Sequence, residues 1–152
     1  MRLKNYTDID SDTIRNLIRF VRPSGISNFD VRVSNYSGTT GRGRAYTQGS
    51  GYHDRADPFI VISIAPEGRF KRQIYEGGGG YLPHVWGSRM EALVHLLAHE
   101  LRHLWQAKHT KGKVWGARGR MSERDADAYA IQMLRRFRRG AAASSESSKE
   151  KT

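Results

Sequence analysis

Apolar residues recur at helical spacing in three parts of the chain. A helix is predicted over 12–22, where apolar positions follow i, i+3, i+4 and i+7 until Pro23 ends it. A second is predicted over 88–108, because Ser88-Arg89-Met90-Glu91 forms a capping box ahead of an apolar stripe. A third is predicted over 123–139, with alanine and larger apolar residues on one face.

Strand patterns lie between the first two helices. Residues 29–33 alternate apolar and polar positions, and 59–64 are β-branched and continuously apolar, which predicts a central strand covered on both faces. Residues 70–75 are a further candidate strand. The stretch 35–54 is rich in Gly, Ser, Thr and Arg and indicates a loop or loose hairpin. The glycines of 77–80 suit either a rim beside a cleft or a plain connector.

This order of elements predicts an α+β fold in which a small mixed sheet packs against helices. The 152 residues suit one domain, expected over 1–140. Residues 141–152 are small and polar, and we expect them to form a disordered tail.

Composition narrows the chemistry. The chain has no cysteine, which excludes disulfides and thiolate ligands, so any metal must be held by His, Asp or Glu. Its first residues contain no apolar signal segment, and no apolar run approaches the roughly 20 residues of a membrane helix. We therefore expect a soluble, cytoplasmic protein with no membrane partner.

The formal charge of +11 favours acidic partners such as nucleic acid, anionic surfaces or acidic proteins. Basic runs at 42–44, 118–120 and 135–139 are candidate contacts to a phosphate backbone. The alternative is that these residues only keep the protein soluble, and that the last run is a solvated helix end.

The second predicted helix contains the motif H-E-x-x-H, formed by His99, Glu100 and His103. Residues four apart lie above one another on a helix, so both imidazoles can reach one ion. Glu100 is rotated by about 100° from His99 and can accept a proton from a water that the metal activates. His95 lies on the same face and is interpreted as a core or supporting residue.

A catalytic zinc site requires a third protein ligand. Glu123 shares the inward face of the last predicted helix, and Asp127, one turn later, can accept a ring N–H from a ligand histidine. Glu123 can also be simply an acidic residue near a helix N-terminus. The rival ligand is His109, which requires a sharp break after His103 because a continuous helix carries it about 15 Å along the axis from His99.

These residues resemble the zincin metallopeptidases, and most closely the gluzincins. The gluzincin pattern places a ligand Glu about twenty residues after H-E-x-x-H and an Asp four residues later, as Glu123 and Asp127 are placed here. The stretch 123–130 also looks like the second motif of ImmA/IrrE-type proteases, which usually carry Asn at the position of Asp127. The metzincins have a third His at the position of His109, but Gly where this chain has Gln106.

The resemblance implies a zinc-dependent metallopeptidase with His99, His103 and Glu123 as Zn²⁺ ligands and Glu100 as general base. It implies a protein or peptide substrate along an edge strand before the active helix, which we expect at 70–75. The oxyanion donor stays open among His109, His84, Tyr81 and Tyr129.

Two other functions remain open at this point. One is a regulatory or DNA-associated protease, SprT-like or ImmA/IrrE-like, that binds nucleic acid through its basic surface. The other is a non-enzymatic, basic nucleic-acid-binding domain with a structural metal or none. The residues indicate neither the oligomeric state nor the cleavage preference.

Overall fold

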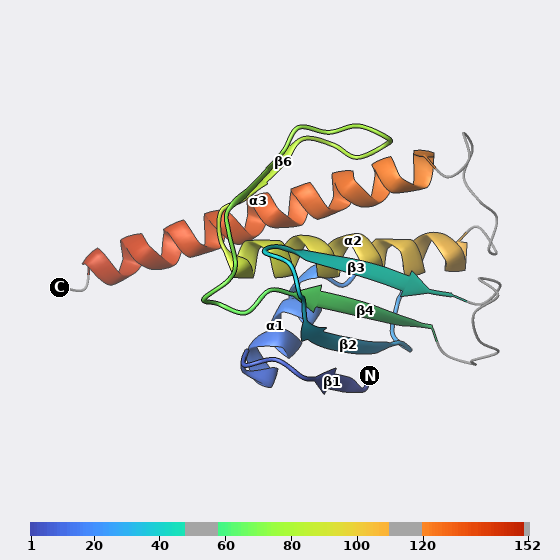
Figure 1. Cartoon of the computed structure of the whole chain (residues 1–152), viewed down its shortest axis with the longest axis horizontal. Helices are drawn as coiled ribbons and strands as arrows, with labels where there is room; N and C mark the ends of the chain where they lie inside the picture. The colour runs from blue at the N-terminus through green and yellow to red at the C-terminus, as the bar shows by residue number, and fades with distance from the viewer. Residues whose placement is uncertain (48–57, 110–119, 151–152) are drawn as a thin grey trace.

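The computed structural model describes residues 1–47, 58–109 and 120–150, and it confirms the predicted α+β class. In this part of the chain, three helices accompany a four-stranded mixed sheet and a separate two-stranded sheet (Figure 1). The elements in chain order are β1 (Leu3–Asn5), α1 (Ser11–Val21), β2 (Asp30–Asn35), β3 (Gly41–Tyr46), β4 (Phe59–Ile64), β5 (Gln73–Tyr75), β6 (His84–Trp86), α2 (Arg89–His109) and α3 (Arg120–Glu150).

The main sheet has the strand order β1-β2-β4-β3. β1, β2 and β4 run parallel, and β3 joins β4 antiparallel at one edge. On β4, Ile60, Ile62 and Ile64 are fully buried, whereas the alternating Phe59, Val61 and Ser63 are only half-buried. The prediction of a central strand is confirmed, but full cover on both faces is wrong, because the helices pack on one face only.

The helices form two layers behind the sheet. α1 and α2 pack on its inner face, and α3 packs against the far side of α2 (Figure 1). Residues 92–101 of α2 are consequently buried on every side rather than along one stripe. Polar side chains in that stretch must therefore find partners inside the protein.

Side chains cap the N-termini of α1 and α2, whereas Ser122, which the sequence offers as a cap for the last helix, lies inside α3. The Asp10 carboxylate accepts from the Thr13 amide at the start of α1 (3.2 Å). The Ser88 hydroxyl accepts from the Glu91 amide at the start of α2 (3.2 Å), and the Glu91 carboxylate accepts from the Gly87 amide (3.4 Å). These caps fix where α2 begins and thereby the phase of the residues it carries toward the sheet.

Strand β3, which contains glycine, and the three-residue strand β5 differ from the predicted elements. The stretch 35–54 was expected to be a loop or loose hairpin; its described part, 35–47, contains β3, which pairs with β4 over six residues, and 48–54 lie outside the described residues. β5 is shorter than the strand expected at 70–75 and pairs with β6, so the edge strand beside α2 is β3 and not 70–75. The four glycines between β5 and β6 all have positive φ, from 61° to 131°, which confirms that no packed element forms there.

The C-terminal helix is longer than predicted at both ends. α3 begins at Arg120 and continues through 141–150, the stretch expected to be a disordered tail. Its core face is as predicted, with Ala126, Ala130, Met133 and Leu134 buried. Within the described ranges, no helix is both long enough and apolar enough to cross a membrane.

Candidate metal centre

Three side chains from two helices converge at the centre of the molecule. His99 and His103 project from one face of α2, and Glu123 comes from the first turn of α3. The Nε2 atoms of the two histidines are 3.1 Å apart, His99 Nε2 is 3.1 Å from Glu123 Oε2, and His103 Nε2 is 3.1 Å from Glu123 Oε1. The structure thus brings together the three ligands that the sequence resemblance implied.

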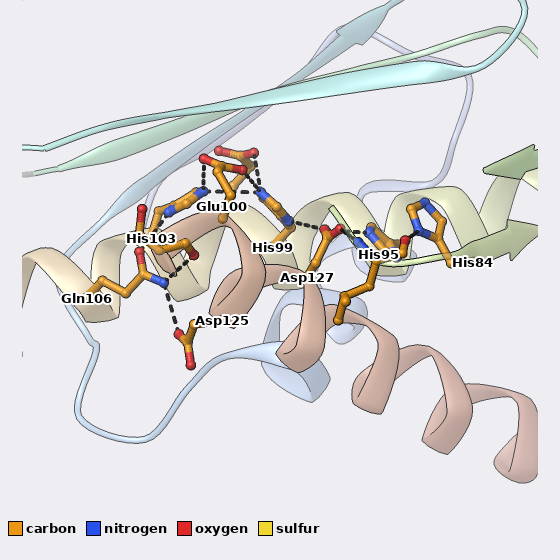
Figure 2. Close-up of polar contacts among 11 residues, drawn as sticks. His84, His95, His99, Glu100, His103, Gln106, Asp125 and Asp127 are labelled. Carbon is orange, nitrogen blue, oxygen red and sulfur yellow. Dashed lines mark hydrogen bonds and ion pairs between the residues drawn. The ribbon is translucent and has the colours of Figure 1, made fainter. Parts of the chain in front are cut away.

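The hydrogen-bond partners of the two Nδ1 atoms set the tautomer of both imidazole rings. His99 Nδ1 donates to Asp127 Oδ1 (2.7 Å), and His103 Nδ1 donates to Gln106 Oε1 (2.8 Å) (Figure 2). With the ring protons held on Nδ1, each neutral imidazole presents the lone pair of Nε2 to the other and to the Glu123 carboxylate. Three electron-pair donors facing one another repel unless a cation or extra protons lie between them.

Gln106 is a contributor that the sequence analysis did not identify. Its amide nitrogen donates to the Ser122 carbonyl (2.8 Å) and to Asp125 (2.9 Å), which fixes the orientation of the amide and turns its oxygen toward His103. Asp125 is in turn held by Arg102 through two contacts of 2.8 and 3.2 Å. The only sequence signal was the i, i+3 spacing of His103 and Gln106, which many helices share.

The donor set fits a zinc ion. Ligand atoms at about 2.0–2.1 Å from a tetrahedral metal lie about 3.3 Å from one another. Here the two Nε2 atoms are 3.1 Å apart, and each lies 3.1 Å from a different oxygen of Glu123. Two neutral imidazoles and one carboxylate also match the ligand types of hydrolytic zinc sites. The hydrogen bonds to both Nδ1 atoms supply the orienting contacts that such sites use.

Glu100 lies beside the triangle that His99, His103 and Glu123 form, and its carboxylate is close enough to group with the two histidines, with donor atoms within 4.8 Å of one another. Its Oε1 is 3.9 Å from His99 Nε2, and the residue is only 6% exposed. Burial raises the pKa of Glu100, which makes its carboxylate a stronger proton acceptor. Strand β3 passes directly over it, since a Cβ at Gly43 would lie 2.8 Å from Glu100 Cγ.

Asp127 joins the triangle to a second group of histidines. Besides His99 it contacts His95 Nε2 (3.4 Å), and its Oδ2 accepts from the Leu82 amide (2.9 Å). His84 stacks on His95 with ring centroids 4.2 Å apart, so that His84, His95 and Asp127 form a second cluster with donor atoms within 4.8 Å. Figure 2 shows this chain of contacts running along α2.

The second cluster differs from the first in its chemistry. Its rings lie face to face, as packed aromatic groups do, rather than turning their nitrogens toward one point. Burial lowers the pKa of His95 to about 4, so this ring stays neutral, and its Nδ1 has no hydrogen-bond partner among the described residues. We interpret His95 as a support for Asp127, as the sequence suggested.

The charges of the triangle are strongly coupled. Burial alone would lower the pKa of His99, but hydrogen bonds to Asp127 and Glu123 and nearby carboxylates raise it to about 10. Burial opposes ionisation of Glu123 as well, yet its bonds to His103 and His99 hold its pKa well below the usual range. In the metal-free state, protons on the histidines therefore take the place of a cation.

A cleft of about 270 Å³ opens onto His99 and Glu100 between β3, the β5–β6 hairpin and α2. Tyr81 follows the four glycines at the tip of that hairpin and lines the cleft, with its ring 6.0 Å from that of His99. Burial and the charge of Glu123, to which it hydrogen-bonds, raise the pKa of Tyr81 to about 12. Its hydroxyl therefore keeps its proton and can donate it to an oxyanion.

His109 and Tyr129, two candidates from the sequence, lie away from His99, His103 and Glu123. α2 continues without a break through His109, which stacks on Trp105 (4.3 Å) about 15 Å along the axis from His99, so it does not join the triangle. The Tyr129 hydroxyl donates to the Val21 carbonyl on the far side of α2. Of the oxyanion candidates, only Tyr81 and His84 line the cleft.

Comparisons with protein-family models, curated proteins and solved structures found no match to this chain. The geometry and chemistry of the centre therefore carry the functional inference.

Proposed function

We propose that this protein is a zinc-dependent metallopeptidase whose metal is held by His99, His103 and Glu123. The observation that carries the proposal is the convergence of three lone-pair donors at zinc spacing, with a buried carboxyl, Glu100, beside them in an open cleft. When bound, the ion supplies Lewis acidity for a water and for the scissile carbonyl.

The chain's own groups have separate tasks. Glu100 accepts the proton of the attacking water and delivers it to the leaving amine, which its burial and raised pKa favour. Asp127 and Gln106 hold the two imidazoles in the tautomer that ligates. Tyr81 donates from the wall of the cleft to the oxygen on which negative charge develops.

Strand β3 is the proposed guide for the substrate. It is an edge of the main sheet, pairs with β4 on one side only within the described residues, and contributes Arg42 and Gly43 to the cleft. An extended peptide can pair with such an edge through its backbone. Because Gly43 lies over Glu100, a peptide bond held there lies near the general base.

Metal content and hydrolysis test the proposal together. We expect about one zinc per chain in the wild type and in Glu100→Gln, and loss of zinc in Glu123→Ala. His109→Ala is the matched control and should keep its zinc. Cleavage of casein and of a mixture of quenched fluorescent peptides should disappear in Glu100→Gln. A Glu100→Gln protein that still cleaves, or a wild type that binds no zinc at neutral pH, contradicts the proposal.

A further inference from the structure

The outer face of the main sheet, away from the helices, is basic. Its exposed cationic side chains come from three strands. Lys4 lies on β1 and pairs in register with Arg32 on β2, and Arg42 and Arg44 lie on β3. In the pairing register, Arg32 and Arg44 flank Val61 of β4, which places their backbones about 10 Å apart. The face thus carries a row of positive charge across the strands.

Each of the three arginines lies over an aromatic ring. The guanidinium-to-centroid distances are 5.1 Å for Arg32 over Tyr6, 5.5 Å for Arg42 over Tyr36 and 5.4 Å for Arg44 over Tyr46. Tyr46 also stacks on Phe59, with centroids 4.5 Å apart and planes inclined by 13°. Tyr6 is 56% exposed, so a flat apolar ring stands open beside a charge.

Carboxylates do not neutralise this face. Among the residues that the structure describes, no acidic side chain forms an ion pair with Arg32, Arg42 or Arg44. Asp30, the acidic residue on the same face of β2, pairs instead with Arg2 (3.1 Å). A solvated surface built only for solubility mixes both signs of charge. On this face, among the described residues, Lys4, Arg32, Arg42 and Arg44 accompany a single carboxylate that Arg2 already pairs, and they lie next to aromatic rings.

We propose that this outer sheet face binds single-stranded nucleic acid, with Arg32, Arg42 and Arg44 contacting phosphates and the exposed Tyr6 stacking on a base. The chain's formal charge of +11 supplies the long-range attraction to a polyanion. Arginine and aromatic side chains side by side on a sheet match a partner that offers both phosphates and unstacked base faces.

The same features separate this partner from other polyanions. A duplex offers phosphates but hides the faces of its bases inside the stack, so the tyrosine rings cannot stack on them. An acidic protein offers carboxylates without flat aromatic surfaces. The inference needs neither the metal nor the proposed peptidase activity, because Arg32 and Arg44 lie on the opposite side of the sheet from His99 and Glu100, and only Arg42, on the edge strand, also lines the cleft.

Fluorescence anisotropy of the full, zinc-loaded chain with labelled oligothymidylate and oligouridylate of about 20 nucleotides tests the proposal. We expect binding at about 50 mM salt that weakens as salt rises. Arg32→Ser with Arg44→Ser should weaken binding by about tenfold or more and flatten the salt dependence. The matched control, Arg15→Ser with Arg19→Ser, removes the same charge from the exposed side of α1 and should change binding by less than about twofold.

A second pair of variants isolates stacking from charge. Tyr6→Ala should weaken binding by about fivefold or more, and Tyr6→Phe should retain it. Equal losses in the two arginine pairs, tighter binding of a duplex of the same length, or equally effective competition by polyglutamate would each overturn the proposal. So would the absence of any binding to both oligonucleotides by a wild-type protein with normal thermal melting.

Discussion

Gln106, a neutral side chain, sets the tautomer and orientation of the candidate ligand His103. Because its amide is anchored by Asp125 and the Ser122 carbonyl, its oxygen must face His103 and keep the ring proton on Nδ1. Gln106→Leu removes that acceptor at nearly the same volume. We expect zinc affinity to fall by about 10- to 100-fold, measured by competition with a chromophoric chelator.

Gln132, exposed on α3, provides the control for this substitution. Gln132→Leu should leave zinc affinity unchanged. If Gln106→Leu binds zinc as tightly as the wild type, the tautomer of His103 is set by something other than the amide.

The raised pKa of His99 makes zinc binding depend on pH. With this pKa at about 10, through its bonds to Asp127 and Glu123, the ring carries an extra proton at neutral pH that zinc must displace. Titration calorimetry near pH 7.5, in buffers of different ionisation enthalpy, should show release of about one proton or more per zinc. Affinity should rise with pH until about 10, where the ring loses that proton.

The same shift has the opposite sign for the stability of the metal-free protein. A histidine whose pKa rises from 6.5 to about 10 on folding contributes stability that is complete below 6.5 and is lost as pH rises through about 10.

The zinc titration has an outcome that contradicts this protonation. If the observed heat of zinc binding does not depend on the buffer, the ring of His99 is already neutral and the carboxylates do not hold its proton.

Five residues of the candidate centre were indicated before the fold was known. Helical spacing placed His99, Glu100 and His103 together, and it favoured Glu123 with Asp127 over His109, as the resemblance to gluzincins also implied. Gln106, Tyr81 and Leu82 contribute through contacts that only the packing of α2 against α3 and the hairpin creates. A residue whose role depends on tertiary distance leaves no periodic signal, so sequence reasoning missed these contributors or left them among several candidates.

At the scale of elements, strand β3 depends on glycine to approach α2. A Cβ at Gly43 would meet Glu100 Cγ at 2.8 Å and Ile62 Cδ1 at 3.0 Å. Gly43→Ala should therefore push the strand and Glu100 apart, lowering stability by about 1–3 kcal/mol and reducing peptide cleavage more than zinc content. Thermal melting, elemental analysis and the peptide assay measure the three effects.

Gly68→Ala is the matched control, because a Cβ there meets nothing within 4 Å. It should change neither stability nor cleavage by a measurable amount. A Gly43→Ala protein that melts and cleaves like the wild type would show that the strand can move away without disturbing the general base.

Glycine also explains why the sequence predicted a loop or loose hairpin, and not a strand of the main sheet, where β3 lies. Gly41-Arg42-Gly43-Arg44 has low strand propensity and no apolar alternation, yet pairing with β4 and the close approach of α2 make it a strand. β1 and β6 have three residues each, too few for a periodic pattern. The predictions for α1, α2 and β4 held because those segments are long and carry strong patterns.

At the scale of the whole molecule, the candidate metal site takes its residues from two helices, of which only α2 packs on the main sheet. α2 packs on the sheet, whereas α3 packs on α2 and supplies Glu123 and Asp127 from its first two turns. The charge of +11 indicated an acidic partner, but only the register of the strands places cations and aromatic rings on one face. The link between α2 and α3 was expected from the third ligand that a zinc site requires, whereas the register of the strands is not local and could not be predicted from the sequence.

This arrangement predicts that zinc stabilises the entire fold. A ligand bound only by the folded state adds about 4 kcal/mol at a thousandfold excess over its Kd, which raises the Tm of a chain of this size by about 10 °C. Removing zinc with a chelator should lower the Tm by that amount, and returning zinc should restore it, as followed by calorimetry.

The control His109→Ala should show the same difference in Tm between its zinc-bound and zinc-free forms. In Glu123→Ala the melting curves with and without zinc should coincide, because the link between α2 and α3 is gone. A zinc-dependent shift that survives in Glu123→Ala would place the stabilising ion outside the triangle, with His84, His95 and Asp127 as the next site to test.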